Sequence, residues 1–99
     1  MKYTRTDAGD ETTLAIDGTL DAVTAPELRT VVDELVNERR PAVTLDLSSL
    51  RLIDSSGVGV IVSLFKRMKL HQGQVKIVGL RDQPRAIFRL LRLDRVFPV

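Results

Sequence analysis

The residue types most able to do chemistry in this chain lie together in a short polar segment, Asp54-Ser55-Ser56-Gly57. The segment follows a strand-like stretch and opens an apolar helical stretch, so it presents a hydroxyl at the start of a helix. The first turn of a helix has unpaired backbone N–H groups and a partial positive charge, which suit either a capping side chain or a phosphate. Ser55 or Ser56 is therefore either a helix cap or a phosphorylated switch.

The chain offers no partner that would turn a serine into a catalytic nucleophile. Its one histidine, His71, lies on the same predicted helix as Ser56, about 22 Å away at 1.5 Å per residue. A catalytic base must lie within hydrogen-bond reach of its nucleophile. The Gly57-Val58-Gly59 segment also lacks the lysine of a Walker loop and the third glycine of a dinucleotide fingerprint. We therefore expect no catalytic residues and no enzyme activity.

Three aspartates, Asp21, Asp46 and Asp54, would have to converge at strand ends to hold Mg²⁺. Each has an ordinary alternative role, as a turn residue, a strand-end residue or a residue flanking a helix. The sequence has no cysteine and no metal-ligand spacing, which removes disulfides and thiolate sites. We expect no metal and no cofactor.

Charge is unevenly divided along the chain. Residues 1–65 carry 6 basic against 11 acidic side chains, whereas residues 66–99 carry 9 against 2, a net −5 and a net +7. The basic half has only Phe88 and Phe97 as aromatic residues, too few for a base-stacking platform, so we expect no direct nucleic-acid binding. Arg85, Arg89 and Arg92 form a basic stripe on the last predicted helix, which is either a solvated face or a contact with an acidic partner.

Length and composition predict a single domain spanning residues 1–99. With 43% hydrophobic and 28% charged residues, the chain resembles an ordinary soluble globular protein. It has no run of roughly 18 apolar residues, and its N-terminus lacks the apolar core of a signal peptide. We expect a cytoplasmic protein with no membrane insertion.

The hydrophobic periodicity predicts the elements that must position the polar segment. Helix 24–40 begins with a capping box of Thr24 and Glu27, and strands 2–6 and 12–17 form a hairpin. The remaining expected elements are strand 42–47, helix 57–71, strand 74–78, helix 82–93 and a final edge strand 95–99. This ββαβαβα order, extended by the last strand, predicts an α/β fold with a mixed sheet, βα crossover units and three to four packed helices.

Loops that follow parallel strands meet at one edge of such a sheet. The loops 17–24 and 47–56 are of this kind, and neighbouring strands would put Asp21 and Ser56 on one rim. The helix after Ser56 carries a core stripe, which Val60 and Leu64 widen toward a second side. Those two residues are either buried against a neighbouring helix or partly exposed as an apolar docking patch beside Ser56.

The run from Asp54 to Ile61, with Gly18-Thr19-Leu20-Asp21 and Thr24-Ala25 upstream, closely resembles the STAS domain of bacterial anti-sigma factor antagonists. The similarity extends in order from about Leu14 to Phe97. It implies a partner-switching protein whose unphosphorylated form binds an anti-sigma factor, itself a serine kinase, and so frees a sigma factor. Phosphorylation ends the binding, and a metal-dependent serine phosphatase restores it.

The resemblance also assigns roles to residues. The family's phosphorylated serine is the second of the motif, Ser56, and the family's loop aspartate falls on Asp21. The expected partner-binding residues are Asp21, Thr24, Asp54, Ser55, Ser56, Gly57, Val58, Val60 and Leu64. The kinase would supply ATP and Mg²⁺, and the free chain would be a monomer.

Two other function classes stay open at this point. One is a STAS subunit that binds a transporter ATPase or serves as a stress-signalling scaffold, with no dependence on Ser56 phosphorylation. The other is a nucleotide-binding enzyme, which would need affinity for ATP or GTP.

Overall fold

The computed structural model describes residues 1–97, and the elements follow the predicted order with one exception at the end. They are β1 (Lys2–Ala8), β2 (Glu11–Leu20), α1 (Ala25–Asn37), β3 (Ala42–Ile53), α2 (Ser55–Leu70), β4 (Gln74–Val78), α3 (Asp82–Leu90) and the 3-10 turn η1 (Leu93–Arg95). The final strand predicted at 95–99 is wrong for its described part, since residues 93–97 form a 3-10 turn and a bend. Pro98 and Val99 lie outside the described residues.

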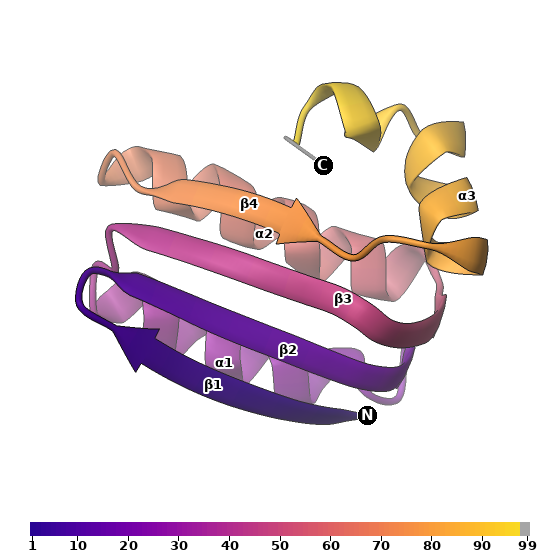
Figure 1. Ribbon diagram of the computed structural model, residues 1–99, viewed down its shortest axis with the longest axis horizontal. Coiled ribbons are helices and arrows are strands. Elements are labelled where there is room, and N and C mark those ends of the chain that lie inside the picture. The colour runs from indigo at the N-terminus through magenta and orange to yellow at the C-terminus, as the bar shows by residue number, and fades with distance from the viewer. Residues whose placement is uncertain (98–99) are drawn as a thin grey trace.

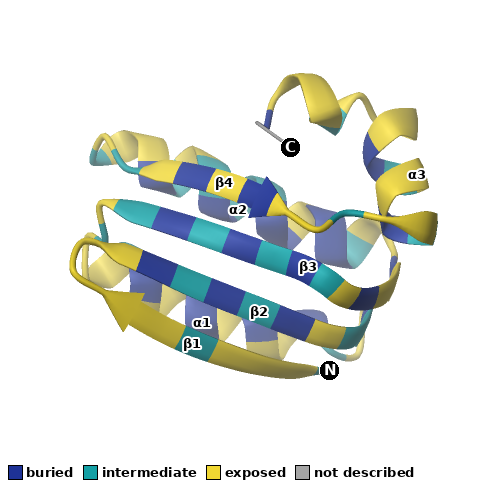
Figure 2. Ribbon diagram, in the orientation of Figure 1, coloured by how far each residue is buried: buried dark blue, intermediate teal, exposed yellow. Residues whose placement is uncertain are grey.

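The four strands form one sheet, which is mixed as predicted, and their order in it is β1-β2-β3-β4. The hairpin of β1 and β2 is antiparallel, and β2 with β3 and β3 with β4 are parallel. Figure 1 shows α1 and α2 on one face of the sheet, with α3 beyond the C-terminal end of β4. Buried and less buried residues alternate along β2 and β3, so only one face of the sheet is covered (Figure 2). None of the described helices is long and apolar enough to cross a bilayer.

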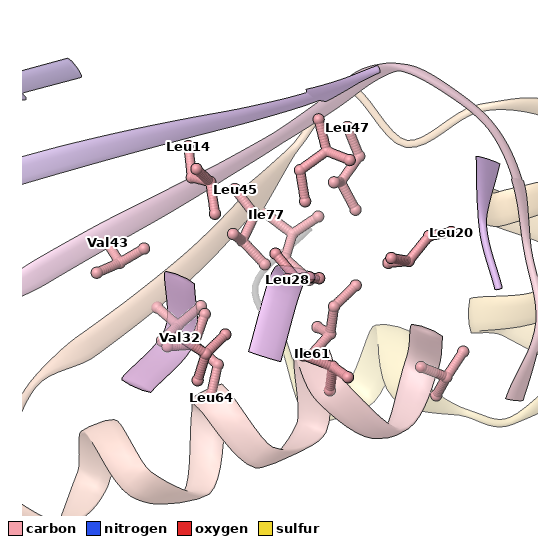
Figure 3. Close-up of a cluster of buried hydrophobic side chains, with 14 of the residues drawn as sticks. Leu14, Leu20, Leu28, Val32, Val43, Leu45, Leu47, Ile61, Leu64 and Ile77 are labelled. Carbon is pink, nitrogen blue, oxygen red and sulfur yellow. The ribbon is translucent and has the colours of Figure 1, made fainter. Parts of the chain in front are cut away.

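The core fills the space between the sheet and the two helices. Figure 3 shows Leu14, Leu45 and Ile77 of three strands gathered over Ile61 and Leu64 of α2, with Leu28 and Val32 of α1 beside them. Val60 and Leu64 are each 1% exposed, because α1 packs along the second apolar side of α2. The expectation of a partly exposed docking patch at these residues is therefore wrong, and the alternative of burial between sheet and helix is confirmed.

Strand β3 is longer than predicted, because the segment 47–53 that reads as a loop continues the sheet. Its pairing with β2 shifts register twice, between Ala15 and Asp17 and between Gly18 and Thr19. At each shift β3 contains one more residue than β2, as in a β-bulge, and the alternation of apolar and polar residues is lost there. The prediction of a loop from Leu47 to Ser56 is wrong for this reason.

The start of α1 also differs from the expectation. Thr24 has helical backbone angles, and its hydroxyl donates to the Thr19 carbonyl (3.0 Å) instead of capping the helix. Ala25 N donates to the Asp21 carbonyl at 2.7 Å, so a turn already precedes the helix. The capping box of Thr24 and Glu27 is therefore not formed.

Helix α3 is fastened to the end of β3 by one side chain. The Gln83 amide accepts from Ile53 N and donates to the Ile53 carbonyl, both at 2.9 Å. Beyond α3, Phe97 packs against Phe65 of α2, with ring centroids 4.6 Å apart, and against Phe88 of α3 at 6.1 Å. These contacts hold the C-terminal part beside the β4 edge of the molecule.

Candidate functional site

The cap of α2 is Asp54, not a serine. Its carboxylate accepts hydrogen bonds from Ser56 N (2.8 Å) and Gly57 N (3.2 Å), and its backbone is extended. Ser55 is exposed and Ser56 is half-buried, and neither hydroxyl makes a hydrogen bond to another of residues 1–97. Because the cap is supplied by Asp54, the capping explanation no longer applies to the two serines.

The loop that follows β2 lies at the same edge as this helix start. Asp54 N donates to the Leu20 carbonyl at 3.1 Å, which joins the ends of β2 and β3. Strands β2 and β3 are neighbours, so the condition under which Asp21 and Ser56 would share one rim is met. The Asp21 carboxylate accepts from Thr24 N (3.1 Å) and Val23 N (2.9 Å), and these bonds hold the pKa of Asp21 below its usual value.

Gly57 allows α2 to approach the strand ends closely. A Cβ added there would lie 2.6 Å from Leu20 Cγ and 2.9 Å from Ile53 Cγ1. Gly57 is itself buried, and Val58 is only 7% exposed. Gly57 and Val58 therefore fix the position of the helix start from within and, like Val60 and Leu64, are buried. That correction removes four residues from the predicted binding surface.

Two outward-facing residues extend the surface that the sequence indicated. Gly59 is exposed, and a Cβ added there would meet nothing within 4 Å. Val23 is 86% exposed in the loop after β2. The sequence marks Val23 as an apolar residue in a polar loop, but it does not show whether the side chain is buried or exposed. We refer to Val23, Ser55, Ser56 and Gly59 as the switch face.

The aspartates do not gather into a metal site. The Asp46 carboxylate accepts from Ser48 N (3.0 Å) and Ser48 Oγ (2.7 Å), while Asp21 and Asp54 hold their own backbone turns. No group of three potential metal ligands occurs within residues 1–97. His71 lies at the other end of α2, where its Nε2 is 3.1 Å from the Arg40 carbonyl oxygen.

Comparison with known proteins gives a family for this arrangement. The model of the STAS domain family matches residues 2–99. This chain belongs to the STAS domain family. An anti-sigma-B factor antagonist of Listeria monocytogenes is 26% identical over 90 residues, which cover 91% of this chain and 79% of the relative.

Solved structures of the family superimpose closely. An anti-sigma factor antagonist from Mycobacterium paratuberculosis has a TM-score of 0.89 and 25% identity, over 98% of this chain and 82% of that one. The Bacillus cell fate determinant SpoIIAA in its phosphorylated form has a TM-score of 0.78, over 95% of this chain and 86% of that one. At 16% identity, the second likeness shows the fold alone.

Proposed function

We propose that this STAS domain is an anti-sigma factor antagonist that is switched by phosphorylation of Ser56. The observation that carries the proposal is the uncommitted Ser56 hydroxyl, which stands on a helix start whose cap is already provided by Asp54. The names of the relatives support the antagonist role. An anti-sigma factor with serine kinase activity would be both the partner and the modifying enzyme.

The unmodified protein would bind its partner through the switch face. Val23 supplies exposed apolar area at the rim, and Gly59 leaves the helix surface flat next to Ser56. A residue without a side chain lets a partner backbone come close to the helix. Asp21 and Thr24 would act by holding the loop that presents Val23, since their polar groups bond one another and the loop backbone.

A phosphate on Ser56 would oppose this contact. It adds a charge of about −1.5 to −2 beside the Asp54 carboxylate, on the rim that also carries Asp21. The amides of Ser56 and Gly57 already bond Asp54, so a phosphate would compete with that carboxylate for these two amides. A loss of about 3 kcal/mol would lower the affinity by about two decades. The core lies below this turn, so the fold would persist.

The rest of the cycle would depend on other proteins. The kinase would provide ATP and Mg²⁺, and a metal-dependent serine phosphatase would return the protein to its binding form. The chain would then be a substrate and a binding partner, not an enzyme. We place this cycle in the cytoplasm, where the chain would act as a single copy that competes with a sigma factor for the anti-sigma factor.

The test combines peptide mass spectrometry with a pull-down. The protein is incubated with ATP-Mg²⁺ and a candidate anti-sigma kinase, and Ser56→Ala and Ser56→Asp are compared with the matched variants Ser55→Ala and Ser55→Asp. We expect a single phosphate on Ser56, binding by Ser56→Ala, and a loss of about 100-fold in Ser56→Asp, equivalent to about 3 kcal/mol. Equal binding by all variants, or a phosphate on Ser55 only, would contradict the proposal.

A further inference from the structure

Within residues 1–97, no strand pairs with the outer edge of β4. Gln74 N donates to the Pro41 carbonyl of the segment before β3 at 2.9 Å, and β4 pairs in parallel with Ala42–Asp46. Alternate residues of a parallel strand turn their backbone groups to the same side, so those of Val75 and Ile77 point away from β3. Within residues 1–97 these outward groups make no backbone hydrogen bond to another segment.

Two hollows lie along this edge and together follow β4 from end to end. The first, of about 510 Å³, is lined by Ile77, Val78, Gly79, Leu80, Arg85, Phe88, Arg89 and Asp94. The second, of about 500 Å³, is lined by Glu11, Ala42, Val43, Thr44, Phe65, Lys69, Gly73, Gln74, Val75, Lys76 and Val96. Figure 1 shows β4 at the border of the sheet, with α3 past its C-terminal end and the C-terminal turn on its outer side.

The charges in these hollows favour an acidic occupant. The first hollow is lined by two basic residues, Arg85 and Arg89, and one acidic residue, Asp94. The second is lined by Lys69 and Lys76 and by one acidic residue, Glu11. None of the four basic side chains forms an ion pair with a carboxylate of residues 1–97, unlike Arg5 and Arg67. Each hollow is therefore net positive. Apolar surface from half-exposed Val78 and Val96 adds area that an extended chain would cover.

We propose that an extended acidic segment of a partner protein adds to the sheet as a strand along the outer edge of β4. Its backbone would pair with Val75 and Ile77, and its carboxylates would bind Arg85 and Arg89 at one end and Lys69 and Lys76 at the other. Main-chain bonds would supply affinity, and the basic side chains would select acidic sequences. This surface uses no residue of the switch face, so it stands independently of phosphorylation at Ser56.

The test uses three blocked nine-residue peptides and amide chemical shifts of the whole protein. The first peptide alternates glutamate and threonine, the second replaces each glutamate by lysine, and the third is the first with N-methyl groups on every second amide. We expect the first to shift the amides of Val75 and Ile77, with affinity that falls as salt rises. The lysine and N-methyl peptides should bind at least about tenfold more weakly. Equal binding by either control peptide would overturn the proposal.

Charge-reversal variants locate the contact. Arg89→Glu should weaken the glutamate peptide by about tenfold, while Arg29→Glu, exposed on α1 at the opposite side of the molecule, should leave it unchanged. Both residues are exposed on helices, so both variants should keep the wild-type spectrum elsewhere. If both variants weakened binding of the glutamate peptide equally, the effect would come from the net charge of the protein alone. That result would overturn the assigned site. Protection of Val75 and Ile77 that rises with protein concentration, without peptide, would instead identify a second copy as the occupant and overturn it.

Discussion

The two ends of the β2 and β3 strands use polar side chains in different ways. Near the hairpin end, Arg5 donates to both oxygens of Glu38 at 2.8 Å and to Asp7 at 3.1 and 3.2 Å, and Arg40 donates to Thr12 Oγ1 at 2.7 Å. These side chains bond one another across β1, β2 and α1. At the end that carries Ser56, the carboxylates bond backbone amides instead, and the serine hydroxyls stay outside every bond among the described residues.

The difference separates a structural polar network from a surface available for recognition. At the hairpin end the guanidinium groups find their carboxylate and hydroxyl partners within the chain, so the network closes on itself. At the switch face the same residue types shape two turns and leave hydroxyls and an apolar side chain pointing outward. A cluster of polar residues is thus a candidate site when its bonds hold the backbone and leave reactive atoms without partners.

The largest predicted loss of stability comes from a substitution of Gly57, at the end of the strands that carries the switch face. Gly57→Ala places a Cβ 2.6 Å from Leu20 and 2.9 Å from Ile53, which forces the helix start away from the strand ends. We expect a loss of about 1–3 kcal/mol in the free energy of unfolding, because packed sites tolerate added volume poorly. Urea unfolding followed by circular dichroism measures it. Wild-type stability would mean that the helix start does not pack tightly against Leu20 and Ile53.

The next effect concerns the cap. Asp54→Ala removes the acceptor for Ser56 N and Gly57 N, and it should lower the free energy of unfolding by about 1 kcal/mol. Asp54→Asn keeps a capping oxygen and should remain close to wild type. If Ser56 could take over the cap, Asp54→Ala would leave the free energy of unfolding unchanged. The Ser56 hydroxyl would then have a structural role. Chemical denaturation of the three proteins distinguishes these outcomes.

At Gly59, substitutions should move stability and partner binding in opposite directions. A Cβ at this position meets nothing within 4 Å, and alanine is a better helix former than glycine. Gly59→Ala should therefore gain about 0.5–1 kcal/mol of stability. On the proposed function, the bulkier Gly59→Leu should weaken partner binding while remaining folded. Thermal unfolding and a pull-down, run on the same preparations, would show whether this flat surface serves the fold or the partner.

The smallest effect is the pH dependence of the hairpin network. Hydrogen bonds from Arg5 lower the pKa values of Glu38 and Asp7 below their ordinary values of 4.5 and 3.8. Groups with lowered folded pKa values stabilise the fold above those ordinary values, and the contribution is lost as the pH falls below them. Glu38→Gln should therefore lower the urea midpoint slightly at pH 7 and less at pH 3. Glu34→Gln, on the same helix, serves as control, and an identical response would refute the role of Arg5.

Much of the fold could be predicted from periodicity. Strand β4 has the predicted bounds, and the hairpin and the order of elements up to α3 were also predicted. The strand 47–53 was missed because its two register shifts disturb the alternation on which strand prediction depends. The serine motif gave the position of the site. The helix cap was assigned less well, since Asp54, Ser55 and Ser56 are all favourable caps and only coordinates show which oxygen is used.

Which apolar residues of α2 are buried and which are exposed could not be predicted from the sequence. Val60 and Leu64 are apolar, and their place depends on whether a second helix covers them, which is a tertiary fact. Val23 shows the reverse case, an apolar residue that a loop turn holds in solvent. Hydrophobicity alone does not separate a core position from a recognition surface.

The two hydrogen bonds between the Gln83 side chain and the Ile53 backbone extend the hydrogen bonding of the sheet beyond its strands. Strand β4 ends opposite Asp46, whereas β3 continues to Ile53, and there one amide side chain imitates the donor and acceptor of a missing neighbouring strand. These hydrogen bonds lie one residue before Asp54. Gln83 thus connects α3 directly to both peptide groups of Ile53, the residue that precedes the Asp54 cap of the serine turn.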